Sequence, residues 1–202
     1  MYFEEVRSHP EAFKWVPYGP FNSVVEIEKW EETWVDSDPN LFLFAVKDKT
    51  RAGPDDIPGE ATADTFAGVV TLMNGSPAHA SVEIGHILIL PKCQRTHVLT
   101  NVVGILLQYC LDSPKDGGLG LRRVQWQTNA ANEASVGAAR RLGFRFEGIL
   151  RWQRVLPEGK VGPGTRDDGR PAGRDTAMLA ICFDDWEGGE REAMTRRMVL
   201  RK

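Results

Sequence analysis

The chain has 202 residues, of which 42% are hydrophobic and 26% charged, and its net charge at pH 7 is −3. This length and composition suit one globular domain with a substantial core and exclude a disordered chain. The negative charge argues against a nucleic-acid partner, which usually meets a basic face.

Further features of the sequence bear on location. Apolar runs are shorter than the roughly 18 residues that a membrane span requires, and the acidic Glu4 and Glu5 do not fit a signal peptide. The three cysteines, Cys93, Cys110 and Cys182, form neither a CxxC nor a Cys/His pair. We therefore expect a cytoplasmic protein with reduced thiols, without a metal site and without a membrane partner.

The first half of the chain predicts one helix and three strands. Two prolines and a glycine over residues 15–21 predict a rigid loop without regular structure. The apolar spacing that follows Ser23 predicts a helix, which Asp36 begins to terminate. Strands are expected at residues 41–46, 64–73 and 82–90, with a polar excursion over 48–63 and a turn over 74–77.

The second half alternates strands and helices. Residues 98–111 are apolar on nearly all sides and predict a helix buried against a sheet. A second helix is expected at 133–142, with Asn132 as its cap and Gly143 as its left-handed terminator. Strands are expected at 123–128, 146–156 and 175–183, loops at 113–120 and 157–174, and a charged tail, with a loose helix, at 184–202.

The order of elements predicts an α/β (α+β) fold. A mostly antiparallel mixed sheet would be flanked by helices, with a crossover through residues 98–111. No composition shift marks a boundary, so one domain is expected to span residues 1–202.

The strongest functional signal is a strand followed directly by a loop and a helix. The strand at 82–90 leads into Gln94-Arg95-Thr96-His97-Val98-Leu99-Thr100. An enzyme that uses an acyl-CoA must hold a diphosphate and an extended pantetheine arm. A strand edge can pair with pantetheine amides, and free N–H groups at the start of a helix can hold phosphates. An ordinary strand–loop–helix connection has the same order.

This strand–loop–helix segment, together with Asn132-x-x-Ser135 and Arg141-Leu142-Gly143-Phe144, resembles the acyl-CoA-binding half of the GNAT N-acetyltransferases. Matches at 15–21, 146–151 and 173–177 extend the resemblance over residues 13–186 and favour the branch similar to ribosomal-protein-alanine acetyltransferases. The resemblance implies a GNAT fold that uses acetyl-CoA. Only fourteen residues precede Trp15, so the first strand that relatives carry is expected to be missing.

The resemblance also implies the cofactor-binding residues. They are Ile87, Leu88 and Ile89 in the strand, Gln94, Arg95, Thr96, His97, Val98, Leu99 and Thr100 in the loop and helix start, and Asn132 and Ser135. His97 and Leu99 stand where the family places small residues, and a side chain there limits how closely the backbone nears a phosphate. His97 is either an exposed residue at the helix start or, like Arg95, a phosphate ligand.

Glu83 and Ser135 are the expected catalytic residues. Glu83 precedes Gln94 by eleven residues, the offset at which histone-type GNAT enzymes place their general base. Its apolar neighbours predict a raised pKa, which suits proton abstraction. The alternative is a structural glutamate in the strand that bonds to backbone or to an arginine. Alternation places His86 on the opposite face. By the resemblance, Ser135 protonates the departing thiolate, unless it only bonds backbone, and a backbone N–H near Leu88 holds the carbonyl oxygen.

The acceptor pocket is expected to be aromatic. Trp15, Tyr18, Phe21, Trp126 and Trp152 would line it, or would pack in the core. The expected reaction is direct acetyl transfer to a small-molecule amine or a protein amino terminus, by a monomer or a homodimer. The alternative is a non-catalytic acyl-CoA-binding regulatory protein, which the unusual residues His97 and Leu99 support.

Overall fold

The protein is described by a computed structural model over residues 2–53, 57, 60, 62–160, 162 and 171–199. Six strands form one sheet in the order β1-β2-β3-β4-β6-β5. Their bounds are β1 Phe42–Lys47, β2 Phe66–Ser76, β3 Ser81–Ile89, β4 Arg123–Asn129, β5 Arg145–Val155 and β6 Gly173–Cys182. Neighbouring strands run antiparallel except β3 and β4, which are parallel. The predicted mixed sheet is confirmed.

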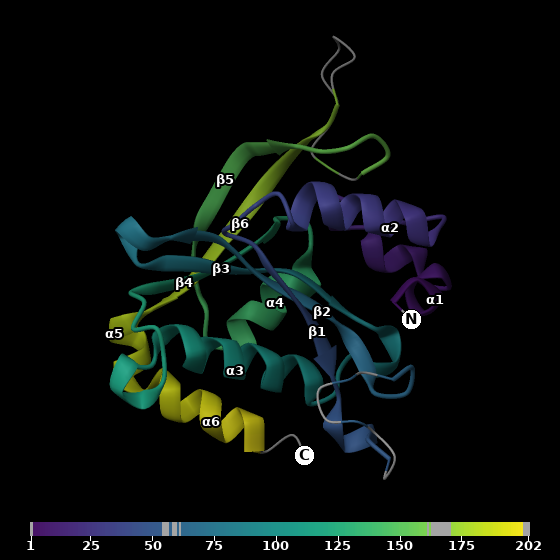
Figure 1. Cartoon of the computed structure of the whole chain (residues 1–202). Coiled ribbons are helices and arrows are strands. Elements are labelled where there is room, and N and C mark those ends of the chain that lie inside the picture. Colours follow the sequence, from purple (N-terminus) through teal and green to yellow (C-terminus); the bar gives the residue numbers. More distant parts are fainter. Residues whose placement is uncertain are drawn as a thin grey trace.

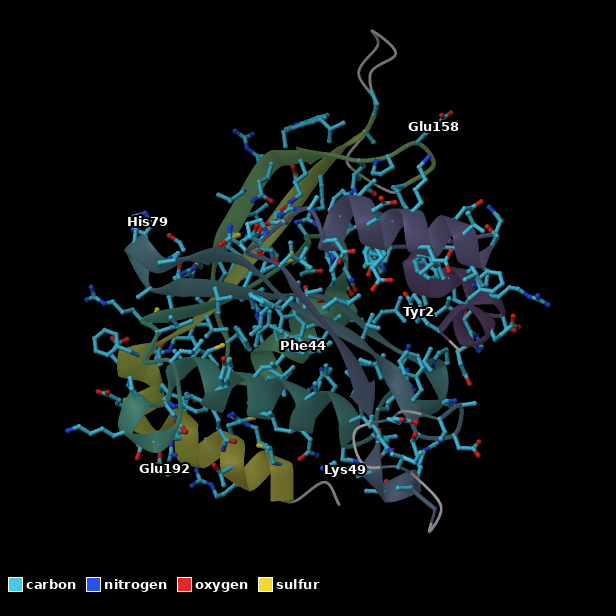
Figure 2. The ribbon with its side chains drawn as sticks, viewed as in Figure 1. Tyr2, Phe44, Lys49, His79, Glu158 and Glu192 are labelled. Atoms are coloured by element: carbon cyan, nitrogen blue, oxygen red, sulfur yellow. The ribbon has the colours of Figure 1, made fainter. Side chains whose placement is uncertain are left out.

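Helices cover both faces of this sheet (Figure 1). On one face lie α1 (Tyr2–Arg7), a short 3-10 turn (Pro10–Phe13) and α2 (Val24–Trp30), which continues as a π-helical turn to Val35. On the other face lie α3 (Val98–Leu111), α4 (Glu133–Arg141) and, beyond α3, α6 (Arg191–Val199). Each face has its own apolar core, and side chains fill the spaces between the layers (Figure 2). No described helix has the length and apolar character that crossing a membrane would require.

The described residues before β1 form helices and turns rather than a strand. Among the described residues, β1 is an edge strand of the sheet and pairs with β2. The prediction of an irregular loop over 15–21 is confirmed, whereas α1 was not predicted. The turn expected at 74–77 lies later, at Pro77–His79, and an irregularity between Met73 and Ser76 places one extra residue in β2 before it.

Helix α3 has the predicted bounds, but its burial differs from the prediction. Ile105 and Tyr109 are 57% and 48% exposed. The sheet covers one side of α3 and α6 a second, so a third side remains in solvent. Gly104 faces Met194 and Met198, and the missing side chain lets α6 pack closely on α3.

The charged tail is more firmly packed than a loose helix. Trp186 and Met194 are buried in the core. Asp112, at the end of α3, accepts hydrogen bonds from the Trp186 indole at 2.8 Å and from the Arg191 guanidinium at 2.7 and 2.9 Å. These bonds attach α5 (Phe183–Asp185), the turn that follows it and α6 to the rest of the protein.

Candidate active site

A cavity opens where β3 and β4 separate. The two strands pair over only three residue pairs, from Ser81 with Arg123 to Glu83 with Gln125. Beyond that point β3 runs on to Ile89 and β4 to Asn129 without further pairing to each other. The cavity is lined from β3 by residues 83–87, from β4 by residues 126–128, and by residues of the N-terminal segment, α4, β5 and β6.

A bulge in β3 changes which face its side chains meet. Val69 and Thr71 of β2 pair with Leu88 and Gly85, so β3 holds one residue more than its partner there. His86 takes a left-handed conformation with φ +45°. Before the bulge Ile84 packs in the core beneath α3, whereas after it Leu88 packs beneath α1 and α2. Simple alternation therefore fails at this point.

The bulge corrects the prediction for His86. Its ring lies 5.2 Å from the ring of Tyr18 and 6.1 Å from that of Trp34, and the residue lines the same cavity as Glu83. Burial first, and then the charges of Arg154 and Arg174, lower the pKa of His86 to about 4. The imidazole is therefore neutral at neutral pH.

Glu83 is a buried carboxyl group, 3% exposed, at the separation point of the strands. Burial raises its pKa above the ordinary value, as the sequence predicted, although the hydrogen bond from Asn74 and the charges of Arg154 and Arg174 oppose the shift. Asn74 donates this bond from Nδ2 at 2.7 Å. Gly85 leaves room for Met73 and for this group, since a Cβ there would lie 2.6 Å from Met73 Sδ and 3.3 Å from a Glu83 carboxyl oxygen.

Ser135 and Asn132 reach the same cavity from the start of α4. Asn132 caps the helix as predicted, because its side chain accepts the Ser135 backbone N–H at 3.2 Å. The Trp126 indole donates to Ser135 Oγ at 3.0 Å. Since Oγ is the acceptor in this bond, the hydroxyl proton remains available to a group in the cavity.

The loop before α3 is folded by its own side chains. Gln94 Nε2 donates to the Ile89 carbonyl at 3.0 Å, and the Thr96 hydroxyl donates to the Cys93 carbonyl at 2.6 Å. Thr96 also accepts the Val98 N–H at 3.3 Å. The first N–H groups of α3 lack intrahelical partners, as at any helix start.

His97 stands at the start of α3, as one sequence interpretation had it, but it is only partly exposed. Its Nε2 lies 3.2 Å from Asp48 Oδ1, and its side chain is 22% exposed. Burial favours the neutral form of Asp48, but the hydrogen bonds from Thr50 and the charge of His97 hold the pKa of Asp48 below its usual value. His97 therefore connects α3 to the segment after β1, and a phosphate contact by His97 or Arg95 stays a prediction.

A hollow beside the start of α3 carries three arginines. Arg95, Arg141 and Arg197 line it together with Thr96, Leu99, Thr100, Ala138 and Leu142. Arg197 is already paired with Glu190 at 3.0 Å. Arg95 has a φ of +60°, a conformation that L-residues rarely adopt. Leu99, at a position where the family places a small residue, borders this hollow.

The strand residues assigned to the cofactor differ in placement. Leu88 and Ile89 bury their side chains in the two cores, whereas Ile87 lines the cavity. Only the backbone of Leu88 and Ile89 can therefore contact a ligand between β3 and β4.

The five predicted aromatic residues are not all brought together. Trp15 and Trp126 line the cavity. Tyr18 and Phe21 pack with Trp30 in the core beneath α1 and α2, which is the alternative of core packing that the sequence left open. Trp152 is 53% exposed on β5 and does not line the described cavity.

Arg154 and Arg174 line the cavity and were not predicted. The sequence prediction ended a loop at Arg174, whereas Gly173 and Arg174 form the start of β6. Arg174 lies within the motif match at 173–177, and both arginines stand near the adjoining ends of two successive predicted strands. In the long loop, residues 161 and 163–170 lie outside the described residues. Lys160 donates from Nζ to three carbonyls, of Phe13, Tyr18 and Gly19, at 2.7–2.9 Å.

Comparisons with known proteins identify the family. The model of the acetyltransferase (GNAT) domain family matches residues 1–145. No curated protein matches the sequence. A GCN5-related N-acetyltransferase from Brucella melitensis has 28% identity and a TM-score of 0.75, over 98% of this chain and 76% of that one. A probable GNAT-family acetyltransferase from Chromobacterium violaceum has 27% identity and a TM-score of 0.72, over 92% and 78%.

A spermidine N-acetyltransferase from Vibrio cholerae, solved with CoA and spermine, shares the fold. It has 17% identity and a TM-score of 0.60, over 92% of this chain and 90% of that one. The branch suggested by the sequence motifs is not among these names and stays a prediction. The family model covers more than half of the chain, and the chain belongs to the GNAT family of acetyltransferases.

Proposed function

We propose that the protein transfers an acetyl group from acetyl-CoA directly to a primary amine bound in the cavity between β3 and β4. One observation carries the proposal: the separation of these strands brings a buried carboxyl group, Glu83, and an available hydroxyl, Ser135, to one cavity. Direct transfer needs an aligned amine and thioester, and no covalent enzyme intermediate. Cys93 is no nucleophile here, because it is buried and burial raises its pKa.

The residues around the start of α3 fit a CoA ligand. Arg95 and Arg141 border a hollow beside the first turn of α3, whose N–H groups lack intrahelical partners, and this combination suits a diphosphate. The edge of β3 beyond Glu83 is not paired with β4 and can receive pantetheine amides. Acetyl-CoA supplies the activated acetyl group.

Glu83 and Ser135 would share the proton transfers. Glu83 takes the proton that the amine loses as the C–N bond forms, directly or through water. Its raised pKa makes it a stronger base than an exposed glutamate. As the C–S bond breaks, the Ser135 hydroxyl donates its proton to the thiolate and regains one from solvent.

Family membership and this acid–base pair favour an enzyme over the non-catalytic alternative. Within the enzyme, Leu99 narrows the approach to the diphosphate but leaves Arg95 and Arg141 on the same hollow. We further propose that the protein works in the cytoplasm, because its three cysteines are free thiols. A monomer or a homodimer is the proposed assembly.

Free-thiol release from acetyl-CoA, measured with a panel of small amines and short peptides, tests the proposal. The expected result is release with at least one acceptor, and mass spectrometry should find the acetyl group on the amine nitrogen. Peptides with an amino-terminal alanine test the branch suggested by the motifs. Cofactor binding without release for any acceptor would contradict the proposed activity.

A further inference from the structure

Two arginines line the cavity from neighbouring strands. Arg154 of β5 and Arg174 of β6 are direct register partners. Cross-strand partners project to the same face of a sheet, and like charges placed directly opposite one another are destabilising. Both residues line the cavity that also holds Glu83. A negative charge near the two guanidinium groups would offset their repulsion.

The described residues supply little of that charge. Arg174 is only 6% exposed, and its Nε donates a hydrogen bond to the Thr176 hydroxyl at 2.9 Å. Within the part of the chain that the structure describes, neither arginine has a carboxylate within ion-pair distance. Burial, followed by the charge of Arg154, lowers the pKa of Arg174 to about 10, so it stays charged at neutral pH.

The remaining titratable residues that line the cavity are Glu83 and His86. His86 is neutral near pH 7, and Glu83 contributes at most one negative charge. The charged groups that line the cavity therefore sum to a positive charge, because two guanidinium groups stand against one carboxylate. That carboxylate loses its charge when it acts as a base. An acceptor with several positive charges would add to this repulsion, whereas an anionic acceptor would relieve it.

We infer that the acceptor is a primary amine that also carries an oxyanion, either a carboxylate or a phosphate, and that Arg154 and Arg174 bind this group. The inference rests on the proposed acetyl transfer and specifies its substrate class. Guanidinium groups bind carboxylate and phosphate through paired, charge-assisted hydrogen bonds. The oxyanion binds between the arginines, and the amine end of the same molecule faces Glu83.

Matched acceptor pairs test this inference. One pair is L-alanine with L-alaninamide, which differ in the carboxylate, and the other is 2-aminoethyl phosphate with ethanolamine, which differ in the phosphate. Spermidine serves as the polycationic comparison. We expect kcat/KM to be about tenfold or more higher for the anionic member of at least one pair. The pair that responds identifies the oxyanion.

Three variants locate the effect. Arg154→Gln and Arg174→Gln should each bring the ratio between the anionic and the neutral member close to one, mainly through a higher KM for the anionic member. Arg151→Gln, at an exposed position of the same strand β5, should leave the ratio unchanged. Thermal unfolding checks that Arg174→Gln is folded, and the half-buried Arg154 carries the test if it is not.

The outcomes separate the two levels of the argument. Acetylation of neutral amines or spermidine as fast as anionic ones overturns the inference while the proposed transfer stands. A preference for anionic acceptors that survives in Arg154→Gln also overturns it. Thiol release with no acceptor at all overturns the transfer itself, and the inference with it.

Discussion

Glu83→Gln is the substitution that most sharply tests the acid–base assignment. Glutamine keeps the shape of the side chain and offers Asn74 an amide oxygen in place of the carboxylate oxygen that it now bonds at 2.7 Å. The packing around this 3% exposed position should therefore survive. What disappears is the group that accepts the proton from the amine.

The size of the loss follows from the role of a general base. Such groups contribute about 10²–10⁴-fold to rate, so we expect kcat/KM to fall about 100-fold at neutral pH. This corresponds to about 2.7 kcal/mol of transition-state stabilisation. Glu192→Gln, on an exposed residue of α6, is the matched control and should keep the full rate (Figure 2).

The pH dependence adds a second signature. Because the pKa of Glu83 is raised, the carboxyl group becomes protonated at a higher pH than an ordinary glutamate, whose value is 4.5. The acid limb of the pH–activity profile should therefore lie above pH 4.5, because Glu83 becomes protonated there and can no longer act as a base. Glu83→Gln should lack this acid limb. Stopped thiol-release assays over a pH series would measure both effects, and a variant with the unaltered rate and acid limb would refute the assignment.

Four further substitutions test other parts of the site and fold. Ser135→Ala should reduce kcat by about tenfold to 100-fold while CoA affinity by calorimetry stays constant, and an unchanged kcat would exclude Ser135 as the acid. Arg95→Ala should weaken CoA binding about tenfold, and an affinity equal to that of the unaltered protein would remove Arg95 from the site. His97→Ala should mainly lower Tm. Asp112→Asn should lower the free energy of unfolding by about 1–2 kcal/mol, a value kept small because the Arg191 side chain is half-exposed. An unchanged midpoint of urea unfolding would contradict this.

The acid dependence of stability has a defined sign at Asp112. The hydrogen bond from Arg191 leads the causes that lower its pKa, which also include the bond from Trp186. A carboxyl group whose folded pKa is depressed stabilises the fold above its unfolded pKa, and this contribution is lost as pH falls through the folded pKa. Asp112→Asn should remove that part of the acid-side loss.

Local patterns in the sequence were sufficient for most elements. Helix α3 begins and ends where apolar periodicity predicted, and α4 has the predicted Asn132 cap and a Gly143 with φ +96°. These features depend on a few neighbouring residues, so sequence alone can reveal them. The candidate residues Glu83, Asn132 and Ser135 also meet in one cavity, in agreement with the motif order.

Other features depend on contacts between distant segments. Strand alternation misplaced His86 because a bulge is set by pairing with β2, which no local pattern of β3 specifies. Arg154 and Arg174 become partners only through the register of β5 and β6. Trp186 is buried through a bond to Asp112, 74 residues earlier, so a charged composition concealed its packing.

A crystal structure of the protein with CoA would test the central claim most directly. We expect the pantetheine to lie along the free edge of β3 between β3 and β4, with its sulfur near the Ser135 hydroxyl and the diphosphate at the start of α3. Density for CoA outside this cleft, or a sulfur remote from both Ser135 and Glu83, would contradict the account.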